Sequence, residues 1–145
     1  MKHKLNCILL IDDDEPTNFI SNMLLEDAGC SNHIQIEESG KGALDYLEQT
    51  ALTGRNGNVL PFPELIFLDI NMPAMNGWEF LEKYSQSILP QQHPEVIIIM
   101  LTTSINPDDK LRADCIPLVA GFANKPLTDT LIQAIMNKYF VTHQV

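Results

Sequence analysis

The sequence predicts a doubly wound α/β fold, with helices on both faces of a five-stranded parallel sheet. Short apolar runs rich in Ile, Leu and Val recur between longer stretches of helical periodicity, and this alternation is typical of βαβ units. Five strands and five helices can be placed in this way. The 145 residues suffice for one domain with a hydrophobic core but not for a second domain of ordinary size. We therefore expect one domain with right-handed crossovers.

The composition excludes several functional classes. With 45% hydrophobic and 19% charged residues, the chain has the balance of an ordinary globular protein rather than a disordered one. Its net charge of -10, with no cluster of Lys or Arg, repels a phosphate backbone and argues against nucleic-acid binding. No apolar run approaches the length of a membrane span. We therefore expect neither a nucleic-acid partner nor a membrane partner.

The cysteines and histidines predict neither a disulfide framework nor a thiolate or histidine metal site. Cys7, Cys30 and Cys115 are far apart and form no Cys-x-x-Cys pair. The four histidines are scattered without i, i+4 pairing.

The start of the chain does not resemble a signal peptide. It has a basic and then an apolar stretch, but four acidic residues follow directly, with no small-residue cleavage site. A reducing cytoplasm suits such a chain.

The first strand and helix are well marked. The strand is expected at Cys7–Ile11, a continuous apolar run of the kind found in parallel sheets that are covered on both faces. A helix should follow at Thr17–Ala28, with Pro16 tolerated in its first turn and Gly29 ending it. Its apolar residues at helical spacing are Ile20, Met23, Leu24 and Ala28.

The middle of the chain continues the alternation. A short strand is expected at His33–Glu38 and a helix at Lys41–Leu52. The segment Thr53–Pro63 is rich in Gly, Asn and Pro without a clear period, which predicts an extended loop. The third strand follows at Glu64–Asp69, and the third helix at Gly77–Ile88. The residues of this helix expected to face the core are Phe80, Leu81, Tyr84 and Ile88.

The last third supplies two more strands and two helices. Glu95–Leu101 is the run with the highest β-propensity, so it should lie at or beside the centre of the sheet. A short polar helix is expected at Pro107–Asp114, a strand at Pro117–Phe122, and a final amphipathic helix through Leu127–Tyr139.

Polar side chains follow four of these strands at the point where each strand ends. They are Asp12 and Asp13, Asp69, Thr102 and Thr103, and Asn124 and Lys125, the last of which precedes Pro126. Ligands of open α/β sheets gather outside the carboxyl ends of the strands. The sequence therefore predicts a site that combines carboxylates, hydroxyls and an ammonium at one edge of the sheet.

This combination predicts metal-assisted phosphoryl chemistry. Three carboxylates brought together repel one another and take up protons unless a cation is present. Oxygen ligands without Cys or His favour Mg²⁺, with Mn²⁺ as a further option. A bound divalent ion attracts phosphoryl oxygens, and Lys125 and Thr102 can hold the group from the opposite side. Asp69 can then act as a nucleophile that forms an acyl phosphate.

Four segments in register are similar to a known family. LLIDDDEPTN, LIFLDINMPAMNGWEFL, IIIMLTTS and GFANKPL resemble the receiver domain of two-component response regulators, the CheY-like superfamily. The resemblance covers essentially the whole chain. It implies the flavodoxin-like (βα)5 fold and a stand-alone receiver of residues 1–145 without an output domain, extended by the loop at about residues 53–63.

The resemblance also implies roles for individual residues. Asp69 corresponds to the phosphoacceptor, while Thr102 and Lys125 correspond to the groups that contact the phosphoryl group. Phe122 occupies the place of the switch aromatic. The implied metal ligands are Asp12, acting through water, Asp13, Asp69 and the backbone carbonyl of Asn71.

The implied function is a phosphorylation-dependent switch that catalyses only its own phosphorylation and dephosphorylation. The donor is a sensor histidine kinase or a histidine phosphotransfer protein. The signal passes to a downstream protein, or to a homodimer, through the face of helix Pro107–Asp114, strand Pro117–Phe122 and the last helix.

Two alternatives remain open. A metal-dependent phosphatase of the haloacid dehalogenase type also forms an aspartyl phosphate, but it needs an Asp where this chain has Asn71. A receiver-fold scaffold that is not phosphorylated is expected to have lost an acidic or lysine position, and none is lost here. For Asp14 and Glu15 we favour a structural interpretation, namely capping of the following helix.

Overall fold

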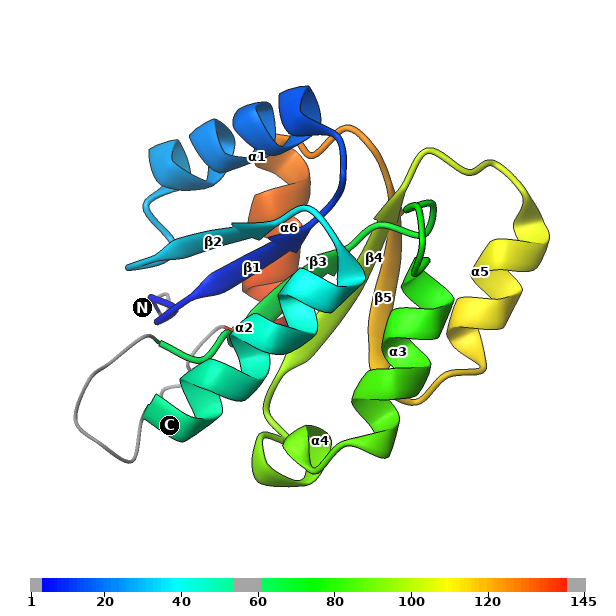
Figure 1. Cartoon of the computed structure of the whole chain (residues 1–145). Helices are drawn as coiled ribbons and strands as arrows, with labels where there is room; N and C mark the ends of the chain where they lie inside the picture. The colour runs from blue at the N-terminus through cyan, green and yellow to red at the C-terminus, as the bar shows by residue number, and fades with distance from the viewer. Residues whose placement is uncertain (1–3, 54–60, 141–145) are drawn as a thin grey trace.

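The predicted doubly wound sandwich is confirmed in the computed structural model, which describes residues 4–53 and 61–140 (Figure 1). Five parallel strands lie in the order β2-β1-β3-β4-β5. They are β1 (Ile8–Ile11), β2 (Ile34–Glu37), β3 (Leu65–Leu68), β4 (Ile97–Thr102) and β5 (Val119–Asn124). The helices are α1 (Glu15–Ala28), α2 (Gly40–Thr53), α3 (Gly77–Gln86), α4 (Leu89–Gln92), α5 (Pro107–Asp114) and α6 (Asp129–Tyr139). No helix among the described residues has the length and apolar character needed to cross a bilayer.

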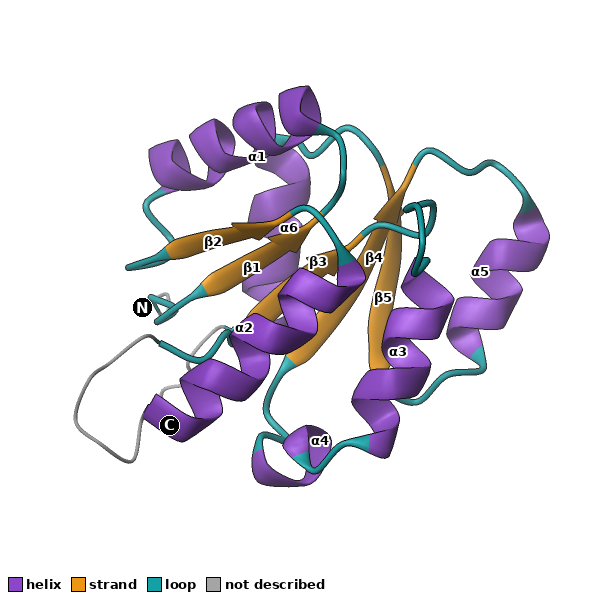
Figure 2. Cartoon of the chain, in the orientation of Figure 1, coloured by secondary structure: helices purple, strands orange, loops and turns teal. Residues whose placement is uncertain are grey.

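The helices form a layer on each face of the sheet (Figure 2). α1 and α6 cover one face, where Leu25 and Ile132 pack against strand residues such as Leu10. The other helices cover the opposite face, where Leu47 and Phe80 pack against residues such as Leu9. Because successive residues of a strand point to opposite faces, a strand buried on both sides must be apolar throughout. This explains the uninterrupted apolar runs of β1 and β3.

The order of the strands determines where a ligand can bind. The chain passes from β1 outward to β2 and then returns to β3, so the direction of winding reverses between β1 and β3. Crevices in doubly wound folds open at such a reversal, outside the carboxyl ends of the strands. β3 is the central strand, and β4 lies beside it, as predicted for the run Glu95–Leu101. Asp12 and Asp69 therefore leave adjacent strands at the reversal.

The end of the third helix was predicted wrongly. α3 ends at Gln86 rather than at Ile88, and an additional one-turn helix, α4, follows. The hydroxyl of Ser87 donates to the carbonyl of Tyr84 at 2.6 Å and accepts from the N–H of Leu89, so the chain changes direction there. Leu89 is consequently buried, whereas Ile88 is 61% exposed. The helical spacing of the apolar residues predicted Ile88 in the core, because this spacing contains no information about a hydrogen bond that ends the helix.

The inward face of the first helix also differs from the prediction. Ile20 and Met23 are 50% and 45% exposed. The buried positions of α1 are Asn18, Ser21 and Leu25. α1 begins at Glu15, two residues earlier than predicted, because Asp14 caps it by accepting from the N–H of Thr17 at 3.1 Å. The capping role expected of Asp14 is therefore confirmed.

Smaller differences concern element ends. β5 runs to Asn124 instead of ending at Phe122, and Thr102 is the last residue of β4 rather than the residue after it. α2 includes Thr53, where the loop was expected to begin. Residues 54–60 of the predicted loop lie outside the described residues. After them, Phe62 stacks on the ring of His93 with 3.7 Å between the ring centroids.

The buried hydroxyl of Tyr84 predicts a stabilising substitution. Among the described residues this hydroxyl has no hydrogen-bond partner, although the side chain is buried. Leaving a buried polar group unpaired costs about 1–3 kcal/mol. We expect Tyr84→Phe to raise the free energy of unfolding by about 1 kcal/mol in urea denaturation. Tyr46→Phe is the matched control: it should lower stability, because the Tyr46 hydroxyl donates to the carbonyl of Pro61 at 3.0 Å. Equal effects of the two substitutions on stability would contradict the conclusion that the hydroxyl of Tyr84 is unpaired among the described residues and that of Tyr46 is hydrogen-bonded.

Stability should fall at alkaline pH because of Cys7. Burial is the main cause that raises the pKa of the Cys7 thiol from 9.0 to about 11. Between these values the unfolded chain loses the proton while the folded chain keeps it, so the free energy of unfolding decreases as pH rises from about 9 to about 11. We expect Cys7→Ala to reduce this slope and Cys115→Ala, at an exposed position, to leave it unchanged. Identical slopes in both variants would contradict the prediction.

Candidate functional site

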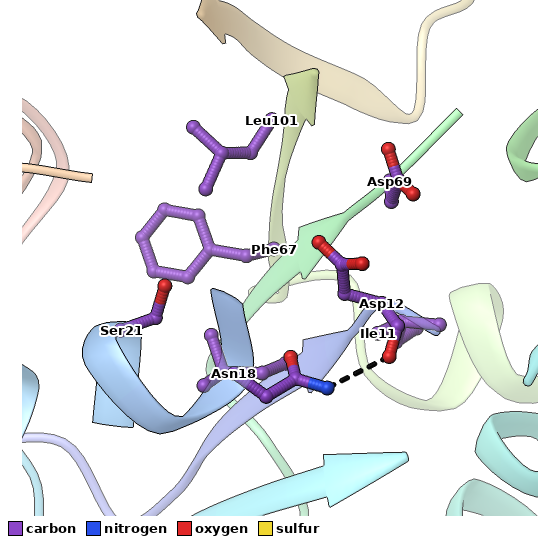
Figure 3. Close-up of a pocket in the computed structure, with 8 residues that line it drawn as sticks. Ile11, Asp12, Asn18, Ser21, Phe67, Asp69 and Leu101 are labelled. Carbon is purple, nitrogen blue, oxygen red and sulfur yellow. Dashed lines mark hydrogen bonds between the residues drawn. The ribbon is translucent and has the colours of Figure 1, made fainter. Parts of the chain in front are cut away.

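The site lies at the carboxyl ends of the strands. Asp12 and Asp69 directly follow β1 and β3, and their side chains are buried (Figure 3). Thr102 ends β4 and is fully buried. Lys125 follows β5, and its backbone N–H donates to the carbonyl of Thr102 at 2.8 Å. The four strand ends thus bring the predicted residues to one edge of the sheet.

The turn that carries the acidic pair is held by local hydrogen bonds. The N–H of Asp14 donates to Oδ1 of Asp12 at 2.9 Å. The side-chain amide of Asn18 donates to the backbone carbonyl of Asp12 at 2.8 Å, as Figure 3 shows. Asn18 is itself buried, so this bond is protected from water. The position of Asp12 is therefore determined by the chain around it as well as by its charged neighbours.

Three carboxylates converge at this edge. Asp12, Asp13 and Asp69 each offer an oxygen, and these oxygens lie within 4.8 Å of one another. Asp12 and Asp69 are buried, whereas Asp13 is exposed. The exposed carboxylate gives the cluster an open side towards solvent, where an incoming group can approach.

The ammonium of Lys125 lies between the two buried carboxylates. Its Nζ is 2.5 Å from Oδ2 of Asp12 and 3.4 Å from Oδ1 of Asp69. Burial opposes the charged form of Lys125, but the hydrogen bond and charge of Asp12, and then those of Asp69, outweigh it and raise the pKa of the ammonium. Lys125 therefore stays charged and partly neutralises the cluster.

Asp69 lies farther from the ammonium of Lys125 than Asp12 does, so its charge is less fully neutralised. Burial and then the charge of Asp12 raise its pKa, while Lys125 and the backbone N–H of Asn71 act in the opposite direction. A raised pKa means that the ionised carboxylate is under-stabilised in the folded protein. A further positive charge next to Asp69 would therefore stabilise its ionised form.

The donor set fits a divalent cation. One ammonium faces three carboxylates, so negative charge remains in excess, and all ligand atoms of the cluster are hard oxygens. Such a set suits Mg²⁺, which takes one or two carboxylates and keeps several waters. Asp12, Asp13 and Asp69 are the side chains that can hold the ion. The contribution of the Asn71 carbonyl stays a prediction, since the contact found for Asn71 is the one from its N–H to Asp69.

The loop after Asp69 is shaped by close backbone contacts. The N–H of Gly77 donates to the carbonyl of Ile70 at 2.8 Å. A Cβ at position 77 would lie only 2.5 Å from the carbonyl oxygen of Asp69, so this position requires glycine. Asn76 then caps α3 in a capping box with Glu79. The start of α3 is therefore packed directly against the backbone of Asp69.

Thr102 and Phe122 occupy the predicted neighbourhood, but their roles stay predictions. Oγ1 of Thr102 accepts from the N–H of Ser104 at 3.1 Å. Phe122 pairs with Met100 across β4 and β5 and is half-buried against the core that α3 and α5 help to form. Both residues lie on the strands that end beside Lys125.

Sequence reasoning missed two buried polar residues of the site, Asn18 and Ser21. With Asp12 and Asp69 they contribute to the lining of a cavity of about 10 Å³ behind the carboxylates (Figure 3), which is roughly the space of one water molecule. The available signal was their i, i+3 spacing in the helix after the acidic turn. Polar residues at that spacing look the same on a solvated face, so the pattern alone could not reveal them.

Comparisons with known proteins identify the family of the chain. The family model of the response regulator receiver domain matches residues 8–137. A two-component response regulator from Cytophaga hutchinsonii has a similar structure, with a TM-score of 0.83 and 31% identity over 94% of this chain and 98% of that one.

Two curated relatives match over part of their length. The response regulator Rcp1 of Synechocystis is 31% identical over 70% of this chain and 65% of its own. The probable methanogenesis regulatory protein FilR2 of Methanothrix harundinacea is 30% identical over 73% of this chain and 63% of its own. The chain thus spans less than two thirds of either relative. With the family model covering most of its residues, the chain belongs to the response regulator receiver domain family of two-component systems.

Proposed function

We propose that the chain accepts a phosphoryl group on Asp69 in a Mg²⁺-dependent reaction and works as a phosphorylation-dependent signalling switch. The observation that carries this proposal is the environment of Asp69. Its buried carboxylate lies at the end of the central strand, within a cluster of three carboxylates, 3.4 Å from the ammonium of Lys125. This arrangement supplies a nucleophile together with the positive charge that phosphoryl transfer needs.

Each residue of the site has its own role in the phosphoryl transfer. A carboxylate oxygen of Asp69 attacks the phosphorus of a phosphohistidine, the P–N bond breaks, and the histidine nitrogen keeps the electron pair. Lys125 neutralises charge on the transferring oxygens, because its ammonium already lies beside Asp69. The hydroxyl of Thr102 donates to one of them. Mg²⁺, when bound by the acidic cluster, offsets the remaining negative charge. Apart from forming and losing this acyl phosphate, the chain acts by binding other proteins.

The surface next to the site supports a protein donor. Phe19, Ile20 and Met23 on α1 are exposed, at 69%, 50% and 45%. Ile20 also contributes to the lining of a groove of about 280 Å³, which is formed by α1, Thr103 and the segment from Lys125 to Leu127. An apolar surface next to a reacting carboxylate suits a helical donor that must bring its phosphohistidine to Asp69. We assign this surface to the cytoplasmic sensor histidine kinase or histidine phosphotransfer protein.

The output face is proposed to be the one formed by α5, β5 and α6. A groove of about 230 Å³ lies there, and Phe122, Leu131 and Tyr139 contribute to its lining. Because Phe122 reaches both this groove and the core, a change at the site can alter the shape of the face. The occupant is a downstream protein or a second copy of the chain.

Acetyl phosphate tests the reaction without a protein donor. With Mg²⁺ the chain should gain one phosphoryl group, visible in intact-mass spectra, and hydroxylamine should remove it because it is an acyl phosphate. Chelation of the metal before the reaction should prevent the gain. A mass that does not change with Mg²⁺ present, or a modification that resists hydroxylamine, would overturn the proposal.

A further inference from the structure

All the polar groups of Ser104, in the loop between β4 and α5, are engaged in hydrogen bonds. Its N–H donates to Oγ1 of Thr102 at 3.1 Å. Its hydroxyl donates to Oδ2 of Asp109 at 2.5 Å and accepts from the N–H of Asn106. Its carbonyl accepts from the side-chain amide of Asn124 at 2.8 Å. Ser104 therefore connects the end of β4, the first turn of α5 and the end of β5.

The contact with Asp109 links the loop to the helix. A hydroxyl bound to an ionised carboxylate makes a charge-assisted hydrogen bond, which is roughly twice as strong as a neutral one. Asp109 is half-buried in the first turn of α5, where the helix dipole favours its charge. The helix does not need Ser104 in order to begin, because Asn106 caps it by accepting from the N–H of Asp108 at 3.0 Å. The bond from Ser104 to Asp109 is thus additional to the cap.

The contact with Thr102 fixes a hydroxyl of the site. Thr102 is fully buried, and its oxygen uses one lone pair to accept from Ser104. A threonine hydroxyl can donate one hydrogen bond and accept two, so its hydrogen stays available to another acceptor. Because the N–H that fixes this oxygen belongs to Ser104, the hydroxyl cannot move far without Ser104.

We propose that Asp109 and Asn124 are positioning residues that hold Ser104 and, through it, couple the hydroxyl of Thr102 to α5. This inference rests on the proposed function. When the hydroxyl follows a phosphoryl group on Asp69, Ser104 moves with it and pulls α5 through Asp109. α5 lies at the β5 side of the sheet (Figure 1), and it carries Leu111, which is 63% exposed, while Ile105 just before it is 94% exposed. A change at the phosphorylation site is thereby transmitted to an exposed apolar surface on and next to α5.

The chain offers a natural reporter on α5. Cys115 is exposed at the carboxyl end of α5, whereas Cys7 is buried and Cys30 is half-buried. In a Cys30→Ser background, an environment-sensitive fluorophore on Cys115 reports the position of α5. Fluorine NMR of beryllofluoride, a phosphoryl mimic, reports occupancy at Asp69 separately. Both measurements use the full chain with Mg²⁺.

If Ser104 couples Thr102 to α5, variants that break its hydrogen bonds should still bind beryllofluoride but should lose fluorescence change at Cys115. At saturating beryllofluoride, Ser104→Ala and Asp109→Ala should still bind the mimic, while the fluorescence change at Cys115 falls at least about threefold. The double variant should lose no more than either single one, since both remove the same link. Asn124→Ala should reduce the change in the same direction. Ser104→Thr, which keeps the hydroxyl, should restore it.

Asp108→Ala is the matched control. It removes an exposed carboxylate from the same helical turn without touching Ser104, so the fluorescence change should stay as in the parent. A full change in both Ser104→Ala and Asp109→Ala would overturn the inference, as would an equal loss in Asp108→Ala. A parent that shows no beryllofluoride signal would instead overturn the proposed function, and the inference with it.

Discussion

Replacing Asp69 with Asn should abolish acceptance of the phosphoryl group. The amide that replaces the carboxylate is not a nucleophile, and neither Asp12 nor Asp13 lies at the end of the central strand. We expect incorporation from acetyl phosphate to fall at least about 100-fold in intact-mass measurements.

Two controls separate this loss from unfolding. Because burial and the charge of Asp12 raise the pKa of Asp69, removing its charge should leave the fold at least as stable as before, which thermal denaturation can check. Asp45→Asn removes a carboxylate from the exposed ion pair with Lys41 on α2 and should leave incorporation unchanged. Incorporation that persists in Asp69→Asn would contradict the assignment of the acceptor.

Replacing Lys125 with Met should make the stability of the fold depend on Mg²⁺. The ammonium lies between two carboxylates whose side chains are only 9% and 7% exposed. Without it, two buried charges are left facing each other, and breaking such a buried pair costs about 3 kcal/mol or more. We expect urea denaturation in the presence of a chelator to show a loss of this size, and added Mg²⁺ to recover most of it. Phosphoryl incorporation should also decrease.

Lys110→Met is the control for this effect. Lys110 pairs with Asp114 at 3.7 Å, but both side chains are largely exposed, at 64% and 59%. Exposed pairs contribute about 0–1 kcal/mol, so this variant should lose little stability and gain no dependence on Mg²⁺. If the two lysine variants respond alike to the metal, Lys125 does not neutralise the cluster.

The sequence predicted most of the fold because a doubly wound sheet leaves a strong pattern. Strands buried on both faces must be apolar at every position, as in Ile8–Ile11, and each then ends at a polar residue. The carboxyl ends of parallel strands meet at one edge, so Asp12, Asp69 and Lys125 could be grouped before any distance was known. Their mutual contacts agree with that grouping.

The rest depends on contacts that a one-dimensional pattern does not contain. Ile88 fits the helical period of α3, but the hydrogen bond from Ser87 to Tyr84 ends the helix first. Asn18 and Ser21 look like solvated helix positions, yet the packing of α1 turns them towards the carboxylates. The link from Asn124 to Ser104 joins residues 20 positions apart, one at the end of β5 and the other in the loop after β4. Such tertiary contacts become visible only once the elements are in place.

The most direct test of the central claim is to locate the phosphoryl group within the chain. After reaction with acetyl phosphate and Mg²⁺, reduction of the acyl phosphate with borohydride converts the modified aspartate into homoserine, which tandem mass spectrometry can place in the sequence. We predict homoserine at position 69 and at no other aspartate. Homoserine at position 12 or 13 with position 69 unmodified would contradict the proposed role of the site.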